Sequence, residues 1–448
     1  MSTFAFGDVK ALQARQNKQV YVDRLGSTWG DSGGEVTYAI AGTDKRFEVQ
    51  ARAASVGGHP MREIFSFENL ETTGTPRGAK LEFAKRGYRQ YNMILTGSEA
   101  YGRYYDGFNP PVAWMSAILD VIGERKLRHV SMIGSHDAGM SVRTGGTVFG
   151  QAANCLTQGF GVYDQLIFGA RFFDIRPVIG NGGRLVTGHY STGLKQGCNG
   201  QFIDDIVRQI NRFTAEHPEL VILHLSHALN TEDDYRSMNS QEWDRVFDAF
   251  EGLTHRCGGI SGDLTSKTMN SFIGNGRACV LVIANQPNVR PAQGIYNIRE
   301  QFEWAGEGHW SDTDRAEVMA ESQTRHLREN RKIMQGTSGD KFYVMQWVLT
   351  LQGIDNVPDD ENPASIAIET IATRLAYDSL FWKGWNAMRP DSYPTVMLLD
   401  FIGVMQQFDR SELIQRPRSE LIALAMAVNL AIASQNPWVG GGTIYKRG

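Results

Sequence analysis

From about residue 112 onward, short apolar runs alternate with longer segments of helical periodicity. Residues 201–216, for example, repeat apolar side chains at the spacing of one helix face, and the continuous apolar run 220–225 follows directly. Such a chain lays its strands side by side in a parallel sheet and covers the sheet with its helices. The alternation therefore predicts an α/β fold, and its extent favours a TIM-type (β/α) barrel.

The candidate strands of this barrel number seven, and an eighth is not evident, so we expect an irregular barrel. The candidate strands are 130–133, 169–178, 184–187, 220–225, 278–284, 342–349 and 395–402. Helices are predicted at 112–123, 201–216, 240–250, 314–334 and 364–380.

The first part of the chain has a different composition. Short runs rich in β-branched and aromatic residues are separated by glycine-containing turns, a pattern typical of antiparallel sheets. We therefore predict an N-terminal all-β domain over 1–115, sandwich-like or a meander, that binds lipid or a partner, and a barrel domain over 116–448. A stretch rich in glycine, aromatic residues and proline marks the boundary near Pro111. The predicted strands are 19–22, 35–41, 46–53, 62–69, 80–84 and 90–96.

The composition of the chain indicates which partners and which cellular compartment to expect. The chain has 45 basic and 49 acidic residues, so it lacks the positive field that attracts nucleic acid. We find no apolar run long enough to span a membrane and no signal-peptide core in residues 1–20. A cytoplasmic protein is expected, or a secreted one if a signal was removed.

The spacing of the four cysteines does not match that of a zinc site. We therefore predict reduced thiols, with a Cys155–Cys198 bridge as the alternative.

Polar residues gather where the candidate strands end, and in a parallel barrel the carboxyl ends of the strands form the active face. Each of these residues has a plainer explanation when taken singly, as a turn residue, a helix cap or half of a structural ion pair. Their occurrence at successive strand ends instead favours one shared site. The candidate catalytic residues are His136, Asp137, Asp174, Arg176, His189 and Asp400.

These residue types suit the cleavage of a phosphodiester by a neighbouring hydroxyl group. The reaction needs a base and an acid, and histidines can serve as both because imidazole titrates near neutrality. It also needs a cation, and Arg176 offers a planar, permanently charged group that matches phosphate oxygens. A carboxylate such as Asp400, placed beside one imidazole, would fix the tautomer of that ring.

Several of these segments resemble motifs of the phosphatidylinositol-specific phospholipase C X-domain family. Residues 133–137 (IGSHD) look like the opening motif of that domain, and 169–176 (GARFFDIR) resemble its second strand. Gly188 and His189 are similar to its third strand, 218–223 to its fourth and 345–350 to a late strand. The resemblance covers about residues 118–435.

The resemblance implies a role for each candidate. His136 would be the general base, oriented by Asp400, and His189 the general acid, assisted by Asp137. Arg176 would hold the phosphate, positioned by Asp174, at the place where related signalling enzymes bind calcium. The expected reaction is metal-independent cleavage of phosphatidylinositol or a related phosphodiester lipid to diacylglycerol and a cyclic phosphate, with no cofactor.

The headgroup pocket departs from the family pattern, because bacterial members carry a lysine and an arginine on the middle strands. The corresponding strand ends here offer His224, Ser226, His227 and Asn285 instead. The substrate-binding candidates are His224, His227, Asn285 and Gln346.

Two other functions remain as alternatives: a metal-dependent glycerophosphodiesterase or phospholipase D-like lyase, and a non-catalytic lipid-binding module. Aromatic residues in the loops suggest either transient membrane contact or ordinary core packing. They are Trp304, Trp310, Phe381, Trp382 and Trp385.

Overall fold

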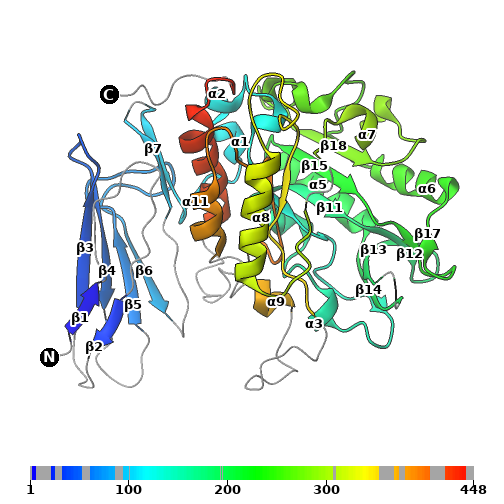
Figure 1. Cartoon of the computed structure of the whole chain (residues 1–448), viewed down its shortest axis with the longest axis horizontal. Helices are drawn as coiled ribbons and strands as arrows, with labels where there is room; N and C mark the ends of the chain where they lie inside the picture. Colours follow the sequence, from blue (N-terminus) through cyan, green and yellow to red (C-terminus); the bar gives the residue numbers. More distant parts are fainter. Residues whose placement is uncertain are drawn as a thin grey trace.

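The computed structural model shows an antiparallel β region followed by a larger α/β region, which lie at the left and right of Figure 1. A parallel sheet runs through the α/β region, and helices and a second sheet surround it. The structure describes residues 3–6, 22–25, 33–52, 61–85, 94–99, 101–191, 193, 195–305, 309–352, 368–372, 379–403 and 419–439.

The central sheet has seven strands, and all of its pairings are parallel. Every residue of β11 and β18 is buried, as expected for strands covered on both faces. The predicted α/β fold is therefore confirmed. In spatial order the strands are β19 (Ile295–Asn297), β18 (Cys279–Ala284), β15 (Leu220–Leu225), β11 (Ala170–Ile175), β9 (Met132–Ser135), β21 (Val396–Leu399) and β20 (Val344–Gln346).

Aromatic rings inside this sheet show that it is strongly curled. The ring of Phe172, on β11, lies 6.0 Å from that of Phe342, although β9 and β21 separate β11 from β20. Trp304 stacks on Phe342 at 5.4 Å and lies 5.4 Å from His224 of β15. Trp304 also forms a parallel bridge with Phe342, just before β20. Strands far apart in the sheet therefore face one another across a shared interior.

The predicted barrel strand at 184–187 is wrong. This segment belongs to β13, which pairs antiparallel with β12 and β14 in a second, six-stranded sheet. Only Arg176 separates β11 from β12, and a tight turn with left-handed backbone at Asn181, Gly182 and Gly183 leads into β13. A parallel connection needs a crossover of a dozen or more residues, so a hairpin forms instead. The strands are β10 (Gly145–Gly146), β14 (Gly197–Phe202), β13 (Arg184–Tyr190), β12 (Pro177–Gly180), β16 (Leu229–Asn230) and β17 (Arg236–Ser237).

Amphipathic helices cover the central sheet. In α5 (Ile203–Glu216), for example, Ile206, Ile210 and Phe213 are buried on one face. The predicted helices at 201–216, 240–250 and 314–334 are confirmed as α5, α6 (Ser240–Phe250) and α8 (Ala316–Asn330). The segment 112–123 forms two short helices, and much of 364–380 lies outside the described residues. The remaining helices are α1 (Trp114–Ala117), α2 (Leu119–Ile122), α3 (Ala152–Cys155), α4 (Val162–Ile167), α7 (Ile298–Gln301), α9 (Ile368–Ile371), α11 (Trp385–Ala387) and α13 (Glu420–Ala427).

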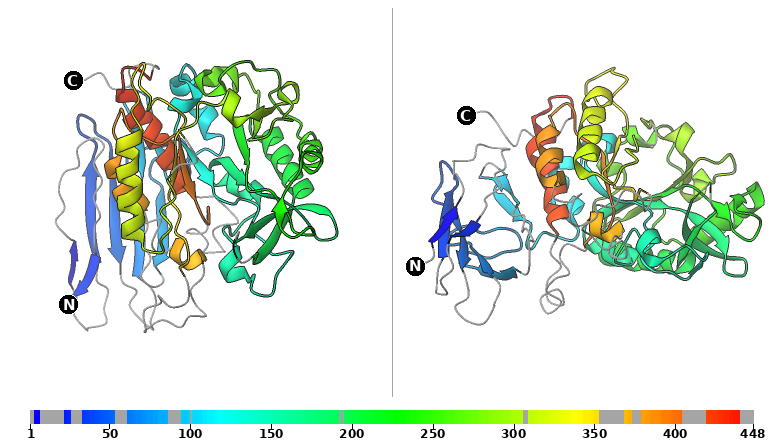
Figure 2. Two further views of the ribbon diagram at one scale, coloured as in Figure 1. Left: turned by 45° about the vertical axis from the view of Figure 1, so that its right-hand side comes forward. Right: turned by 60° about the horizontal axis from the view of Figure 1, so that its bottom comes forward.

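The N-terminal region contains an antiparallel meander, as predicted. Phe65 of the meander packs with Tyr104 and Phe108 in a small core of its own. Helix α13, red in Figure 2, lies between this region and the central sheet, where it packs against β7, β8 and β9. The meander is β3 (Gly33–Ala39), β4 (Arg46–Arg52), β5 (Met61–Ser66) and β6 (Lys80–Lys85), and two further antiparallel pairs are β1 (Thr3–Phe6) with β2 (Val22–Leu25) and β7 (Leu95–Ser98) with β8 (Arg103–Asp106). Most of the predicted strands 19–22 and 90–96 lies outside the described residues.

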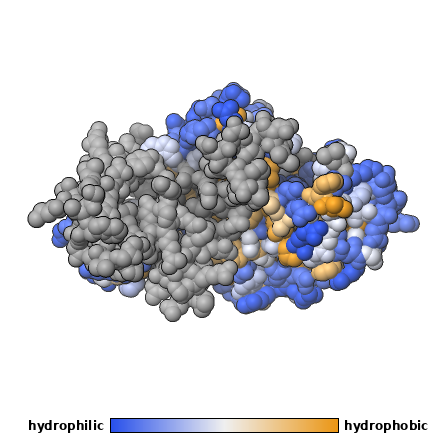
Figure 3. Space-filling view, turned by 90° about the horizontal axis from the view of Figure 1, so that it is seen from below, coloured by the Kyte–Doolittle hydropathy of each residue, from blue (hydrophilic) through white to orange (hydrophobic). Residues whose placement is uncertain are grey.

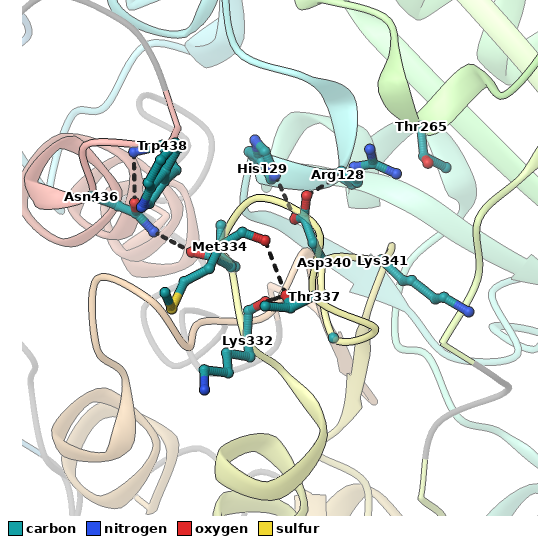
Figure 4. Close-up of polar contacts among 12 residues, drawn as sticks. Arg128, His129, Thr265, Lys332, Met334, Thr337, Asp340, Lys341, Asn436 and Trp438 are labelled. Atoms are coloured by element: carbon teal, nitrogen blue, oxygen red, sulfur yellow. Dashed lines mark hydrogen bonds and ion pairs between the residues drawn. The ribbon is translucent and has the colours of Figure 1, made fainter.

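Charged side chains brace the amino end of the central sheet. His129, just before β9, contacts Asp340 at 2.6 Å between Nε2 and Oδ1, as Figure 4 shows. Arg128 pairs with the same carboxylate and with Glu303, which adjoins Trp304. This cluster ties the segments that begin β9 and β20 at the end of the sheet opposite to the predicted active face.

All four cysteines form disulfides, Cys155–Cys198 and Cys257–Cys279. The prediction of reduced thiols is therefore wrong, and the alternative Cys155–Cys198 bridge is present. Folding brings the paired Cα atoms to 6.0 and 5.4 Å, a proximity that spacing in the sequence does not reveal. No helix in the described part of the chain is long and apolar enough to cross a bilayer.

Candidate active site

Three adjacent strands bring the central group of candidate residues together. His136 follows β9, Arg176 follows β11 and Asp400 follows β21. Ser135, the last residue of β9, is aligned with Phe173 of β11 and Leu399 of β21. Because parallel strands end at one edge of the sheet, the residues beyond these positions share the carboxyl edge.

His136 lies between a carboxylate and a guanidinium. Its Nδ1 is 2.7 Å from Oδ1 of Asp400, which is 3% exposed. Its Nε2 is 2.8 Å from Nη2 of Arg176. A guanidinium can only donate, so Nε2 accepts and Nδ1 carries the proton given to Asp400. Burial alone would lower the pKa of His136, but the charge and hydrogen bond of Asp400, together with the charge of Asp174, leave it above its ordinary value.

Arg176 is held in place by two carboxylates. Its Nε donates to Oδ2 of Asp174 at 3.0 Å, and its Nη1 lies 3.4 Å from Oδ2 of Asp137. Ser226, after β15, donates to the other oxygen of Asp174 at 2.6 Å. Burial would raise the pKa of Asp174, but Arg176, the two nearby histidines and the hydrogen bond from Ser226 together outweigh it, and the pKa falls below its ordinary value. A fixed cation with a fixed orientation results.

Asp137 is the least satisfied group of the site. Its side chain is 0% exposed, and neither carboxylate oxygen has a hydrogen-bond partner among the described residues. Burial, partly offset by Arg176, raises the pKa of Asp137 to about 7. Its backbone is left-handed, as are those of His227 and Phe401, which also stand just beyond the ends of central strands. Strained backbone of this kind often occurs at functional sites.

His189 reaches the site from the second sheet. It lies near the end of β13, and its Nδ1 is 4.0 Å from Oδ2 of Asp137. The same nitrogen donates to the backbone carbonyl of Cys155 at 3.1 Å. Burial and then the charge of Arg176 lower the pKa of His189 to about 4. The second histidine is therefore neutral near pH 7 before any ligand binds.

The four substrate-binding candidates lie at the same end of the sheet, around the residues described above. His224 is aligned with Asp174 and half-buried beside Trp304. His227 is exposed, with Nδ1 2.8 Å from the Ser226 hydroxyl, and Asn285 is exposed just after β18. Gln346 ends β20 and is half-buried, and its backbone N–H donates to a side chain of α8.

A buried segment that the sequence motifs did not predict links these strands. Gln158 donates from Nε2 to the carbonyl of His136 at 2.8 Å and to that of Leu399 at 3.2 Å. The hydroxyl of Thr157 donates to the carbonyl of Asp137 at 2.9 Å. These residues bind backbone atoms of strands far away in the chain, and their types and local spacing give no signal of it.

The loop aromatics divide between the interior and the surface. Trp304 packs inside the curled sheet, so it is not available for membrane contact. Trp310 is 55% exposed, and Val148 and Phe149, just before α3, are 82% and 71% exposed. Figure 3, a view from below, shows hydrophobic atoms on the face of the α/β region that also carries α3 in Figure 1.

No group of three or more histidine, cysteine or acidic side chains within the described ranges is arranged to hold a metal ion. The charged centre of the site is instead Arg176, surrounded by His136, Asp137 and Asp174.

Comparisons with known proteins give structural neighbours only. No family model matches the chain, and no curated protein is found to be similar in sequence. A point mutant of the phosphatidylinositol-specific phospholipase C from Staphylococcus aureus is similar in structure, with a TM-score of 0.47 and 12% identity over 70% of this chain and 96% of that one. The phosphatidylinositol-specific phospholipase C from Listeria monocytogenes has a TM-score of 0.43 and 12% identity over 70% and 98%. Both identities are low, so the side-chain geometry carries the functional proposal.

Proposed function

We propose that this protein is a phosphodiesterase of the phospholipase C type, which cleaves phosphatidylinositol or a related phosphodiester lipid without a metal ion. The observation that carries the proposal is the arrangement around His136, with Asp400 on Nδ1 and the guanidinium of Arg176 at Nε2. This arrangement places a base whose tautomer is fixed beside a cation of the kind that binds phosphate.

The proposed first step is attack by a hydroxyl of the headgroup on its own phosphorus. A phosphate oxygen takes the place of His136 Nε2 as a partner of Arg176, and Nε2 then accepts the proton of the attacking hydroxyl. The imidazolium that forms is stabilised by Asp400, which is already 2.7 Å away. The charge that develops on the phosphate is met by Arg176, which Asp174 and Asp137 hold in position.

The second proposed proton transfer protonates the leaving oxygen of the lipid. His189 donates from Nε2, because Nδ1 is committed to the carbonyl of Cys155. Before substrate binds, the ring has a pKa of about 4 and carries only its Nδ1 proton; the charge of the bound phosphate raises the proton affinity of the ring, so that Nε2 takes up from water the proton that it then donates. Asp137, with a pKa of about 7 and 4.0 Å from His189, holds a proton nearby at neutral pH. The products are diacylglycerol and a cyclic phosphate.

Exposed apolar side chains of the α/β region support a lipid substrate. The exposed side chains of Val148, Phe149 and Trp310 suit brief contact with a lipid surface. We assign the chemistry to a domain spanning 116–448 and an accessory role to 1–115. His224, His227, Asn285 and Gln346 are proposed to contact the headgroup, since they stand at or just beyond the carboxyl ends of β15, β18 and β20.

Phosphorus NMR on vesicles containing phosphatidylinositol tests the proposal directly. We expect a cyclic phosphate signal that persists in excess EDTA and disappears in His136→Ala and His189→Ala. His255→Ala is the matched control, because the carbonyl of His255 binds Val280 at the amino end of β18, away from the site. This variant should retain activity.

The other outcomes distinguish the alternatives. Loss of turnover in EDTA would favour a metal-dependent phosphodiesterase or lyase. Binding to vesicles without turnover of any phospholipid in a panel would favour a non-catalytic lipid-binding module. Either result contradicts the proposal.

A further inference from the structure

The Cys155–Cys198 disulfide lies directly beside His189. Cys198 is the residue of β14 aligned with His189 across the β13–β14 pair. Cys155 ends α3, and its backbone carbonyl accepts the hydrogen bond from His189 Nδ1 at 3.1 Å. The disulfide therefore joins Cys198, which lies opposite His189 in the sheet, to Cys155, whose carbonyl accepts the hydrogen bond from the His189 ring.

Residues 155–158, which we name the strap, continue from this bridge across the site. Thr157 binds the carbonyl of Asp137 through its hydroxyl, and its own carbonyl accepts from the backbone of Phe401 at 2.7 Å. Gln158 binds the carbonyl of His136 and accepts from Ile402 at 3.0 Å. The strap thus contacts His189 at one end and the backbone around His136 and Asp400 at the other.

The bridge adds a covalent link to a short segment that is otherwise held by a capping box of Gln151 and Asn154. Helix α3 is a single turn of four residues, too short to be stable by itself. Its first three residues are exposed, whereas Cys155 is 2% exposed and packs in a small cluster with Met140 and Cys198. Without the bridge, the carbonyl of Cys155 would lose its covalent link to β14.

We propose that the Cys155–Cys198 disulfide is a positioning element of the active site: it holds the carbonyl of Cys155 against His189 and thereby fixes the proton of that ring on Nδ1. A carbonyl can only accept, so the contact leaves Nε2 as the nitrogen that exchanges a proton with substrate. The inference rests on the proposed function for the role of His189, but the contact itself does not depend on that role.

The chain supplies a matched control, because the second disulfide, Cys257–Cys279, lies at the start of β18 at the other end of the sheet. The test compares the full-length double variants C155S/C198S and C257S/C279S. The tautomer of His189 is measured from two-bond proton–nitrogen NMR spectra, with His189→Ala to assign the ring. Steady-state kinetics on phosphatidylinositol vesicles and a pH profile complete the comparison.

We expect C155S/C198S to lose the Nδ1–H tautomer of His189 and to lower kcat by about tenfold to a hundredfold, with KM nearly unchanged. Loss of the carbonyl contact also lowers the pKa of His189 further, so the pH profile shifts. In C257S/C279S the tautomer, kcat and the pH profile should match those of the unaltered protein. A C155S/C198S protein with an unchanged tautomer and kcat would overturn the proposal.

If C155S/C198S does not fold, chemical reduction of the Cys155–Cys198 disulfide tests the same proposal. In C257S/C279S, a phosphine reductant breaks the remaining bridge: the S–S bond accepts two electrons, each sulfur takes a proton and the phosphine becomes its oxide with the oxygen of water. Reduction should change the tautomer and lower kcat, and reoxidation should restore both. Unchanged values after complete reduction would refute the inference. If the unaltered protein cleaves no lipid, the proposed function fails, and the NMR comparison still decides whether the bridge positions His189.

Discussion

Replacing Asp400 with asparagine tests the proposed base most directly. The carboxylate is buried and lies 2.7 Å from Nδ1 of His136, so it faces the positive charge that the ring acquires when it takes a proton. Two unit charges about 4 Å apart interact by about 4 kcal/mol at an effective dielectric constant of about 20. Losing this stabilisation in the transition state corresponds to a roughly thousandfold fall in kcat.

The assay is cyclic phosphate formation followed over pH. His136 must be neutral to act as a base, and Asp400 raises its pKa, so the activity of the unaltered protein is lost as pH falls through that raised value. In Asp400→Asn the acid limb of the profile should therefore move to lower pH. Asp340→Asn is the matched control, since Asp340 makes the same kind of contact with His129, at 2.6 Å, at the opposite end of the sheet. That variant should lower the melting temperature but leave kcat within about twofold. An Asp400→Asn protein with near-normal kcat and an unmoved acid limb would refute the assignment of His136 as the base.

Three further predictions concern charge, pH and packing. Arg176→Lys keeps the positive charge but loses the forked guanidinium that contacts His136, Asp174 and Asp137 together, so kcat for phosphatidylinositol should fall by about a hundredfold. A loss below about threefold would contradict the proposed role of Arg176 in holding the phosphate. Because the pKa of Asp137 is raised to about 7, the folded protein loses stability as pH rises from about 4 to about 7. Over that interval the melting temperature of Asp137→Asn should rise relative to that of the unaltered protein, while its activity is lost. If the melting temperatures of the two proteins changed in parallel with pH, the raised pKa would be contradicted. Trp304→Ala should lower the free energy of unfolding by about 3 kcal/mol through the cavity it leaves, whereas Trp310→Ala, at a 55% exposed position, should change it by about 0.5 kcal/mol or less, as measured by denaturant titration.

The parallel sheet was predictable because its strands are continuous apolar runs flanked by helices of clear periodicity, as β15 and α5 illustrate. Strand β19 was not, because its three residues lack the longer apolar run that surrounds the equally short β20. The placement of 184–187 failed for a different reason. Its composition is strand-like, but the short turn at 181–183 brings the chain straight back from β12 as a hairpin, and composition does not show which strand a segment will pair with.

The grouping of His136, Arg176 and Asp400 followed from the rule that parallel strands end at one edge. What the rule could not supply is which atoms meet. The contact of Arg176 with Nε2, the complete burial of the Asp137 carboxylate and the carbonyl of Cys155 on His189 depend on side-chain rotamers and on loops between strands. The pairing of all four cysteines likewise depends on proximity created by folding.

The residues of the site are separated by very different distances along the chain, and this affects the order in which their contacts can form during synthesis. Arg176 and His189 belong to neighbouring segments joined by the β12–β13 hairpin, whereas His136 and Asp400 are 264 positions apart. Local hairpins form early and long-range contacts late. A growing chain can therefore place Arg176 beside Asp174 before Asp400 is available to contact His136. The proposed activity needs β21 to dock beside β9, so we expect it to be absent from any chain too short to contain β21.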